Sequence, residues 1–206
     1  MASVDFIYFD LGKVILDFDH DIGCQSVSKV AGISPTQAKE AIFDSGLEDK
    51  FETGLVSSDE FYESFCQTTN SQPDKNALMR GISDIFVANI QMFPVITQLR
   101  AINFPMGILS NTCQAHWDFV FANYTVLQHF FSPMILSYEV NSMKPDSKIY
   151  DRAIEMAGCH VKNCFFVDDK PENVEGAIAA GMDAVLCRSV SELVDQLKTR
   201  GVEINL

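Results

Sequence analysis

Short apolar runs recur along the chain and alternate with segments whose apolar residues fall on one face of a helix. The runs cover residues 4–9, 106–109, 134–137, 164–167 and 184–187. Runs of this length, bounded by polar and turn-forming residues, are typical of buried strands. Because strands that alternate with helices usually pair in parallel, the pattern predicts an α/β fold built on a doubly wound parallel sheet.

Several local signals place helices between these strands. Residues 147–157 carry apolar side chains at helical spacing, which predicts an amphipathic helix packed on the sheet. Pro171 suits the first position of a helix, and Gly181 suits the turn that ends one. Ser189 and Glu192 have the spacing of a capping box, so we expect a further helix to begin there.

Residues 19–87 depart from this alternation because they contain no convincing strand. Ser34 and Ser57 each open a capping box, which predicts helices instead. The segment is too long for a single crossover helix between two strands. We therefore expect a small helical cap inserted after the first strand, with the core formed by residues 1–18 and 88–206. The alternative is that these helices cover one face of the sheet.

Acidic residues outnumber basic ones, with a formal net charge of -13. This charge argues against binding to nucleic acid or to an anionic membrane, and it favours attraction of a divalent cation. No apolar run approaches the ~20 residues that a membrane-spanning helix needs. The N-terminus does not resemble a signal peptide, so the expected compartment is the cytoplasm. The sequence does not indicate an oligomeric state.

Polar side chains follow the predicted strands at the points where these strands end. They are Asp10, Ser110, Asn111, Lys144, Asp168 and Asp169. The carboxyl ends of parallel strands meet at one edge of a sheet, where α/β proteins bind their ligands. Helix capping alone would explain Ser110, Asn111 or Asp168 individually. It does not explain why a lysine and three carboxylates gather at one edge of so acidic a chain.

This set of side chains suits phosphoryl transfer. A carboxylate nucleophile and a phosphate are both anionic, so nearby cations must offset their repulsion. Asp10, Asp168 and Asp169 provide the oxygen ligands that Mg²⁺ prefers. Lys144 adds a mobile positive charge with three hydrogen-bond donors.

Further groups at the same edge can bind the oxygens of a phosphate. The hydroxyl of Ser110 is one such donor, and the ammonium of Lys144 is another. The backbone amides of Leu11, Gly12 and Asn111 follow strand ends and can point toward an anion. The sequence thus predicts one site that binds both a metal ion and a phosphate group.

Four segments, FDLGKV, LSN, KP and VDDKPEN, resemble in order the four motifs of the haloacid dehalogenase superfamily of hydrolases. The resemblance covers essentially the whole chain, including a helical cap after the first motif and a Rossmann-like core. It implies that Asp10 is the nucleophile, that Ser110 binds the phosphate, and that Lys144 steadies both. It also implies that Asp169 ligates the metal directly while Asp168 supports the site.

Gly12 departs from the pattern of typical phosphatases in this superfamily, which carry a second aspartate two residues after the nucleophile. That aspartate protonates the leaving group and activates water, whereas Gly12 offers only a backbone carbonyl that can ligate Mg²⁺. The chain most resembles a subgroup with the motif D-L-G-N-V, which includes bacterial phosphatases of α-D-glucose 1-phosphate; Lys13 replaces its asparagine. Loss of the acid costs about 10²–10⁴-fold in rate unless Asp17, Asp19 or a cap residue substitutes.

The resemblance therefore implies a Mg²⁺-dependent phosphatase that works through an aspartyl-phosphate. The expected substrate is a small phosphorylated metabolite of the sugar phosphate class. One alternative is a metal-independent 2-haloacid dehalogenase, although a metal-free site gains nothing from clustered carboxylates. Another is a non-catalytic phosphate-binding or regulatory module. Residues 51–54 resemble a cap loop that closes over the site, and the alternative there is a plain helix-ending turn.

Overall fold

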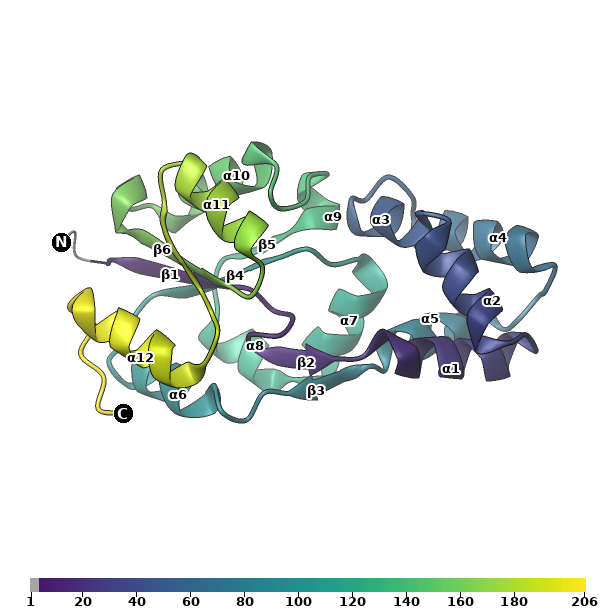
Figure 1. Cartoon of the computed structure of the whole chain (residues 1–206), viewed down its shortest axis with the longest axis horizontal. Helices are drawn as coiled ribbons and strands as arrows, with labels where there is room; N and C mark the ends of the chain where they lie inside the picture. Colours follow the sequence, from purple (N-terminus) through teal and green to yellow (C-terminus); the bar gives the residue numbers. More distant parts are fainter. Residues whose placement is uncertain (1–3) are drawn as a thin grey trace.

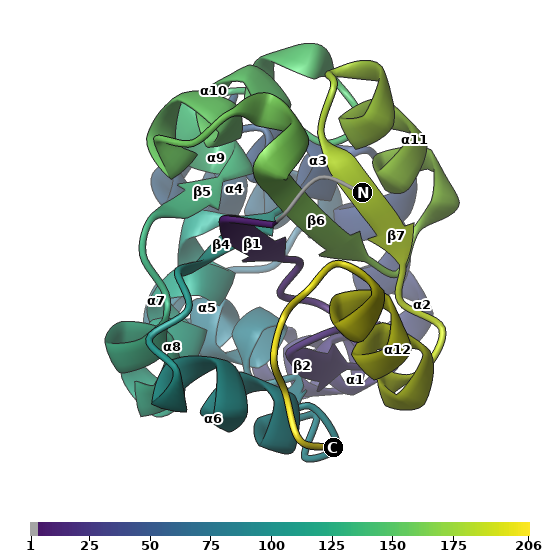
Figure 2. The same ribbon diagram turned by 90° about the vertical axis from the view of Figure 1, so that its left-hand side faces the viewer.

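A parallel sheet occupies the centre of the larger part of the molecule (Figure 1, Figure 2). The computed structural model describes residues 4–206. The strand order is β5 (Met134–Leu136), β4 (Met106–Ser110), β1 (Phe6–Phe9), β6 (Cys164–Asp168) and β7 (Asp183–Leu186). All four neighbouring pairs are parallel. The predicted doubly wound α/β fold is confirmed.

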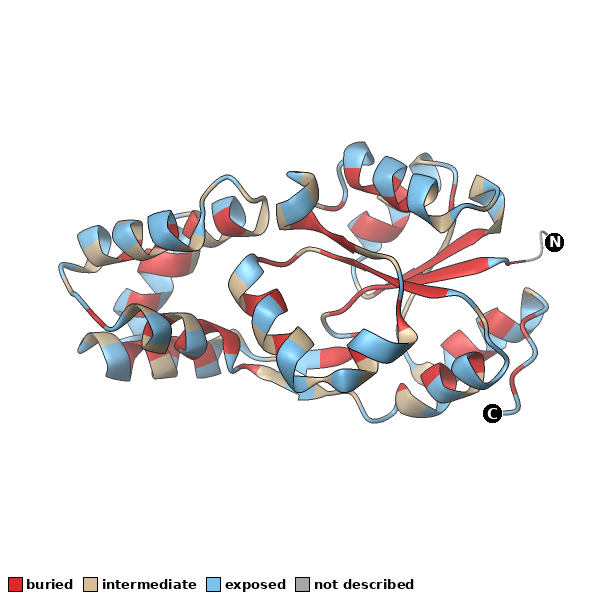
Figure 3. Cartoon of the chain, turned by 180° about the vertical axis from the view of Figure 1, so that it is seen from behind, coloured by how far each residue is buried: buried red, intermediate tan, exposed pale blue. Residues whose placement is uncertain are grey.

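Helices cover both faces of this sheet, which explains why its strands are apolar on both sides. One face is covered by α9 (Ser137–Val140), α10 (Ser147–Ala157) and α11 (Pro171–Ala179), and the other by α6 (Phe93–Ala101), α7 (Gln114–Asn123), α8 (Thr125–Phe130) and α12 (Val190–Thr199). A short 3-10 helix, η2 (Val161–Asn163), precedes β6. Along β1, Ile7 and Phe9 join one apolar cluster, while Phe6 and Tyr8 join the other. β1 is therefore buried on both faces (Figure 3).

A second group of helices lies beyond the carboxyl ends of the strands (Figure 1). It consists of α1 (His20–Ala31), α2 (Pro35–Lys39), the π-helix η1 (Glu40–Asp44), α3 (Leu47–Glu52), α4 (Ser58–Thr69) and α5 (Lys75–Ser83). These helices bury an apolar cluster of their own that includes Val27, Phe65 and Leu78. The capping boxes at Ser34 and Ser57 are both present. This arrangement supports the proposal that residues 19–87 form a cap.

A two-stranded antiparallel ribbon connects the two parts, and the sequence pattern predicts neither of its strands. Leu16–Phe18 forms β2 and pairs with β3 (Phe86–Ala88). The expectation of no strand within residues 19–87 is thus wrong at its end, where β3 begins. Each strand has only three residues, and both Asp17 and Val87 are exposed, so there is too little alternation to detect.

None of the helices in the described part of the chain is long and apolar enough to cross a membrane. The remaining strand predictions hold to within two residues at each end. β1 begins at Phe6, two residues later than expected, while β4 and β6 each extend one residue further, to Ser110 and Asp168. These extensions bring the polar residues of the predicted site onto the strands themselves.

The separate apolar cluster of the cap predicts a large stability cost for a truncation within it. Phe65 on α4 is fully buried, so Phe65→Ala should lower the free energy of unfolding by about 3–5 kcal/mol. Gln67→Ala, at an exposed position of the same helix, should change it by less than about 0.5 kcal/mol. Urea unfolding followed by circular dichroism measures both free energies. Equal effects of the two substitutions would contradict the prediction that burial of Phe65 stabilises the cap.

Candidate active site

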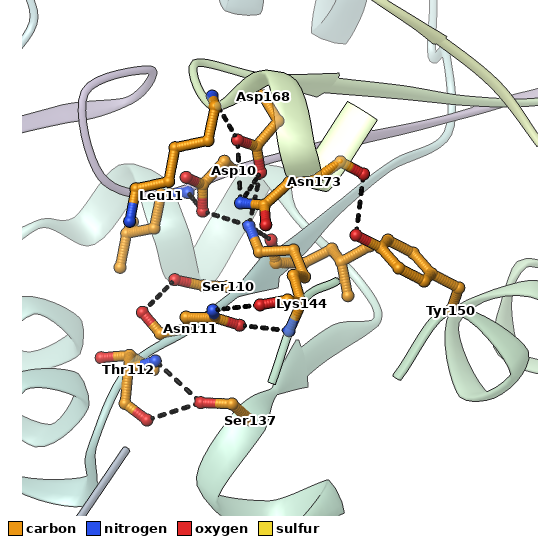
Figure 4. Close-up of polar contacts among 12 residues, drawn as sticks. Asp10, Leu11, Ser110, Asn111, Thr112, Ser137, Lys144, Tyr150, Asp168 and Asn173 are labelled. Carbon is orange, nitrogen blue, oxygen red and sulfur yellow. Dashed lines mark hydrogen bonds and ion pairs between the residues drawn. The ribbon is translucent and has the colours of Figure 1, made fainter. Parts of the chain in front are cut away.

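The carboxyl ends of β1, β4 and β6 bring the predicted site residues to one edge of the sheet (Figure 4). Asp10 follows β1, Ser110 ends β4 and Asp168 ends β6. The register places Phe9 opposite both Ile108 of β4 and Val167 of β6, so these three ends lie side by side. Lys144 reaches the same edge from the loop before α10.

The ammonium group of Lys144 lies at the centre of the site, and its side chain has no exposed surface. Its Nζ is 2.8 Å from Oδ1 of Asp10, 2.7 Å from Oδ2 of Asp168 and 2.8 Å from the carbonyl oxygen of Leu109. Three acceptors thus surround a group that has three N–H donors. Burial lowers the pKa of Lys144, but the two carboxylates outweigh this effect and raise it. The lysine is therefore charged at neutral pH.

The carboxylate of Asp10 has one occupied oxygen and one free oxygen. Oδ1 contacts Lys144 and accepts a hydrogen bond of 2.7 Å from the backbone amide of Leu11. Oδ2 accepts no hydrogen bond from any of residues 4–206. Burial raises the pKa of Asp10 to about 7, although Lys144 opposes this rise. Asp10 therefore presents a single unpaired oxygen from a fixed position.

The two adjacent aspartates after β6 have different environments. Asp168 is fully buried and accepts hydrogen bonds from Lys144, from the backbone amide of Lys170 at 2.8 Å, and from Nδ2 of Asn173 at 3.1 Å. Within the described chain, the carboxylate of Asp169 has no hydrogen-bond donor other than its own backbone amide. Burial and the neighbouring carboxylate of Asp168 raise the pKa of Asp169. Asp168 is thus a fixed structural anchor, whereas Asp169 is available to a ligand.

Asp10, Asp168 and Asp169 form a group of carboxylates whose oxygens lie within 4.8 Å of one another. The carbonyl oxygen of Gly12 lies at the same edge and accepts no hydrogen bond from the described residues. All of these potential metal ligands are hard oxygen atoms, which suit Mg²⁺ better than a softer metal. The residues present therefore fit a magnesium ion.

Asn111 has a role in the structure that the sequence did not indicate. Its Nδ2 donates to the carbonyl of Lys144 at 3.0 Å, and its Oδ1 accepts from the amide of Lys144 at 2.8 Å. This pair of bonds fixes the backbone that carries the ammonium group.

The backbone amides of Gly12 and Asn111 have no acceptor among the described residues, whereas that of Leu11 is used by the adjacent carboxylate. The Ser110 hydroxyl makes only a long bond of 3.3 Å, to the Asn111 carbonyl.

Asn173, which the sequence analysis did not assign to the site, connects the site to the interior of the core. It is buried and donates to both carboxylate oxygens of Asp168. Its carbonyl in turn accepts a hydrogen bond of 2.8 Å from the hydroxyl of Tyr150 on α10 (Figure 4). Asn173 belongs to the VDDKPEN segment, so the motif contained a signal for it, but its amide could be taken for an ordinary helix residue.

The space beside Gly12 is filled by the side chain of Phe18. A Cβ atom at Gly12 would lie 2.7 Å from Cε1 of that ring, so a side chain there requires the ring to move. Asp17 and Asp19, the first candidates to replace the missing acid, do not line the cavity above Asp10. Asp17 is exposed, and the side chain of Asp19 caps α1. Neither residue is placed to exchange a proton with a substrate.

A cavity of about 240 Å³ lies between the edge of the sheet and the cap. Core residues on its wall include Asp10, Ser110, Lys144 and Asp169, and cap residues include His20, Glu48, Asp49 and Glu52. The sequence marked only residues 51–54 of the cap as facing the site. The other cap residues occupy polar faces of α1 and α3, and nothing in a polar helix face shows which side of it meets the core.

Comparison with known proteins finds a match to the family model described as haloacid dehalogenase-like hydrolase over residues 7–187. Pyrimidine 5'-nucleotidase YjjG of Escherichia coli is 27% identical over 191 residues, 86% of this chain and 83% of that protein. D-ribitol-5-phosphate phosphatase of Bacteroides thetaiotaomicron is 24% identical over 180 residues, 82% of this chain and 84% of that protein.

Among solved structures, a Bacteroides thetaiotaomicron enzyme of this family, bt-2542, in complex with magnesium and inorganic phosphate, has a TM-score of 0.81. It is 23% identical, and the match covers 93% of this chain and 99% of that one. This similarity shows a shared fold. The finer resemblance to the glucose 1-phosphate phosphatases with D-L-G-N-V stays a prediction.

The contacts of Lys144 predict a pH-dependent loss of stability when its charge is removed. Lys144→Met leaves two buried carboxylates unpaired, which should lower the free energy of unfolding by about 3–5 kcal/mol at pH 8. Burial raises the pKa of Asp10, and without the ammonium the main opposition to this rise is lost. The loss of stability should therefore shrink as the pH falls through the folded-state pKa of Asp10 and this carboxylate becomes neutral.

Urea unfolding at pH 8 and pH 5.5, in excess chelator, measures this effect. Lys162→Met, at an exposed position, is the matched control and should change the free energy of unfolding by less than about 0.5 kcal/mol at either pH. An equal loss at both pH values for Lys144→Met would show that packing, and not unpaired charge, dominates.

Proposed function

The chain belongs to the haloacid dehalogenase-like hydrolase family, and we propose that it is a magnesium-dependent phosphatase of a small phosphomonoester. The observation that carries this proposal is the environment of Asp10. One oxygen of its carboxylate is held by Lys144 and by a backbone amide, while the other has no partner in the described chain. Such a carboxylate has the fixed orientation and the free lone pairs that a nucleophile needs.

In the first step, Oδ2 of Asp10 attacks phosphorus, the bond to the ester oxygen breaks, and an aspartyl-phosphate forms. The Lys144 ammonium reduces the repulsion between the carboxylate and the phosphate. The Ser110 hydroxyl and the amides of Gly12 and Asn111 bind the phosphate oxygens. In the second step, water attacks phosphorus, which releases inorganic phosphate and restores the Asp10 carboxylate.

Asp10, Asp169 and the carbonyl of Gly12 would hold the magnesium ion, with Asp168 in support. Asp168 already accepts hydrogen bonds from three donors, whereas the Asp169 carboxylate has no donor among the described residues other than its own backbone amide. When bound, magnesium offsets the negative charge of the phosphate group. The magnesium and phosphate complex of bt-2542 supports magnesium as the metal.

The cavity suits a small phosphorylated metabolite, and a sugar phosphate is the class of substrate that we propose. The cavity volume of about 240 Å³ is below the range of ~300–1,000 Å³ that drug-sized ligands occupy. The relatives include phosphatases named for small phosphorylated compounds, D-ribitol 5-phosphate among them. His20 and Asp49, on the cap side of this cavity, offer hydrogen-bonding groups to a hydroxylated leaving group.

The carboxylates at the sheet edge also weigh against the two alternative functions. A metal-free dehalogenase would hold three carboxylates at this edge with one ion-paired ammonium, that of Lys144, among them. A non-catalytic phosphate-binding module would not need an unpaired oxygen on Asp10. Both features are accounted for when a magnesium ion and a phosphate group occupy this site.

The first prediction from this proposal is a strict metal requirement. Turnover of p-nitrophenyl phosphate should require Mg²⁺ and fall to background in excess chelator, because the repulsion among three carboxylates and a phosphate is then not offset. Colorimetric assays with and without chelator measure this. Unchanged turnover in chelator would contradict the proposal, and halide release from 2-chloropropionate without metal would support the dehalogenase.

The second prediction concerns the nucleophile. Asp10→Asn should lower kcat on p-nitrophenyl phosphate by about 10³-fold or more, because an amide is a poor nucleophile. Beryllofluoride, a mimic of the acyl-phosphate, should bind the wild type in the presence of Mg²⁺ and should not bind the variant. Fluorine NMR detects this binding, and substantial activity of Asp10→Asn, with deamidation excluded by mass spectrometry, would rule out the covalent route.

A further inference from the structure

We propose that Glu52, at the end of α3 in the cap, is the general acid and base that replaces the aspartate absent at Gly12. This inference rests on the proposed phosphatase function. It follows from three features: Glu52 lines the same cavity as Asp10, its carboxylate is unpaired, and its backbone is bonded directly to the core.

The position of Glu52 is the first of these features. The cavity is lined by Asp10 and Lys144 from the core and by Glu48, Asp49 and Glu52 from α3. The Glu52 carboxylate makes no hydrogen bond and no ion pair with any residue of the described range 4–206. A carboxyl group on the wall of the cavity that also contains the nucleophile, without a hydrogen-bond partner in the described chain, is free to bond with the leaving-group oxygen.

A hydrogen-bonded junction fixes the backbone of Glu52 to the core. Oγ of Ser137, at the start of α9, lies 2.6 Å from the carbonyl oxygen of Glu52 and 2.9 Å from that of Thr112. The same Oγ accepts from the amide of Thr112 at 2.9 Å (Figure 4). Thr112 follows the segment that carries Ser110 and Asn111. The cap residue is thus joined through one side chain to the loop that binds phosphate.

The next turn of the cap loop makes a second contact with the core. Nδ2 of Asn141 lies 3.3 Å from the carbonyl of Thr53 and 3.4 Å from that of Gly54. Gly54 has a φ of 73°, and a Cβ atom there would lie 2.2 Å from the carbonyl oxygen of Tyr138. Only glycine allows this approach. The loop is therefore built to dock on the core, which favours the cap-loop interpretation over a plain helix-ending turn.

The protonation of Glu52 suits this role. Burial raises the pKa of its carboxyl to about 7, with Lys170 opposing the rise and Asp49 adding to it. A general acid works best when its pKa lies near the operating pH, because it then both gives and recovers a proton. The titratable groups around Glu52 are Glu48 and Asp49 on its own helix, Asp10 and Lys144 from the core, Cys113 before α7, and Lys170 before α11.

Proton transfer by Glu52 completes both steps of the reaction. As Asp10 attacks phosphorus and the P–O ester bond breaks, the Glu52 carboxyl gives its proton to the departing oxygen, which leaves as an alcohol. The Glu52 carboxylate then takes a proton from the water that attacks the aspartyl-phosphate. The bond between phosphorus and Asp10 breaks, inorganic phosphate leaves, and Glu52 is protonated for the next turnover.

Glu48 is the matched comparison because it lies one turn earlier on the same face of α3 and also lines the cavity. Its Oε1 lies 3.8 Å from Nδ1 of His20, a titratable neighbour that Glu52 does not have. Burial raises the pKa of Glu48 to about 8 and lowers that of His20. Glu48→Gln therefore tests whether any acid on this wall is sufficient.

The experiment measures kcat/KM of the wild type, Glu52→Gln and Glu48→Gln with Mg²⁺ on p-nitrophenyl phosphate and on an alkyl ester, glycerol 2-phosphate. Glu52→Gln should lose about 10²–10⁴-fold on the alkyl ester and less than about 10-fold on the aryl ester, whose phenolate leaves without a proton. Glu48→Gln should keep the wild-type ratio of the two rates. Glu52→Asp should recover part of the loss on the alkyl ester.

The pH dependence gives an independent readout. For the wild type, kcat/KM on glycerol 2-phosphate should fall as the pH rises through the Glu52 pKa, because only the protonated carboxyl donates, and Glu52→Gln should lack this decline. An equal loss on both esters would make Glu52 a structural or binding residue and overturn the inference, and so would wild-type rates on both esters. Failure of the proposed function is distinct, because the wild type would then not hydrolyse p-nitrophenyl phosphate at all.

Discussion

The buried ammonium of Lys144 is the interaction on which the rest of the site depends. Taking a charge out of water costs several kcal/mol, and the cost is offset only when every donor finds a partner of suitable geometry. Asp10 and Asp168 provide two of these partners, and the carbonyl of Leu109 provides the third. Because the three partners come from the ends of three adjacent strands, the ion pairs require the sheet order that the structure has.

The two carboxylates that hold the lysine differ in whether they also serve the reaction. Asp168 is used entirely for position, since Asn173 and a backbone amide occupy the rest of its oxygens. Asp10 keeps one oxygen free. The same lysine therefore fixes the nucleophile and reduces the charge that an incoming phosphate meets. This explains how an acidic site can bind an anion once a divalent cation contributes as well.

The sequence predicted those parts of the structure that depend on local pattern. Strand ends that carry Asp10, Ser110 and Asp168 are visible because each polar residue directly follows an apolar run. The ribbon of β2 and β3 was missed because three-residue strands with an exposed Val87 show no periodicity. The contacts of Asn111 with Lys144 were missed for another reason: they join residues 33 positions apart, and only the folded chain brings them together.

If Glu52 donates the proton, as proposed, in place of an aspartate at position 12, the cap takes part in the chemistry. An acid two residues after the nucleophile belongs to the core and is present whether or not the cap is docked. An acid on α3 reaches the leaving group only while the Ser137 junction and the Gly54 contact hold the cap loop against the core. Proton donation is then coupled to docking of the cap loop, so that poor leaving groups react only while the loop is docked.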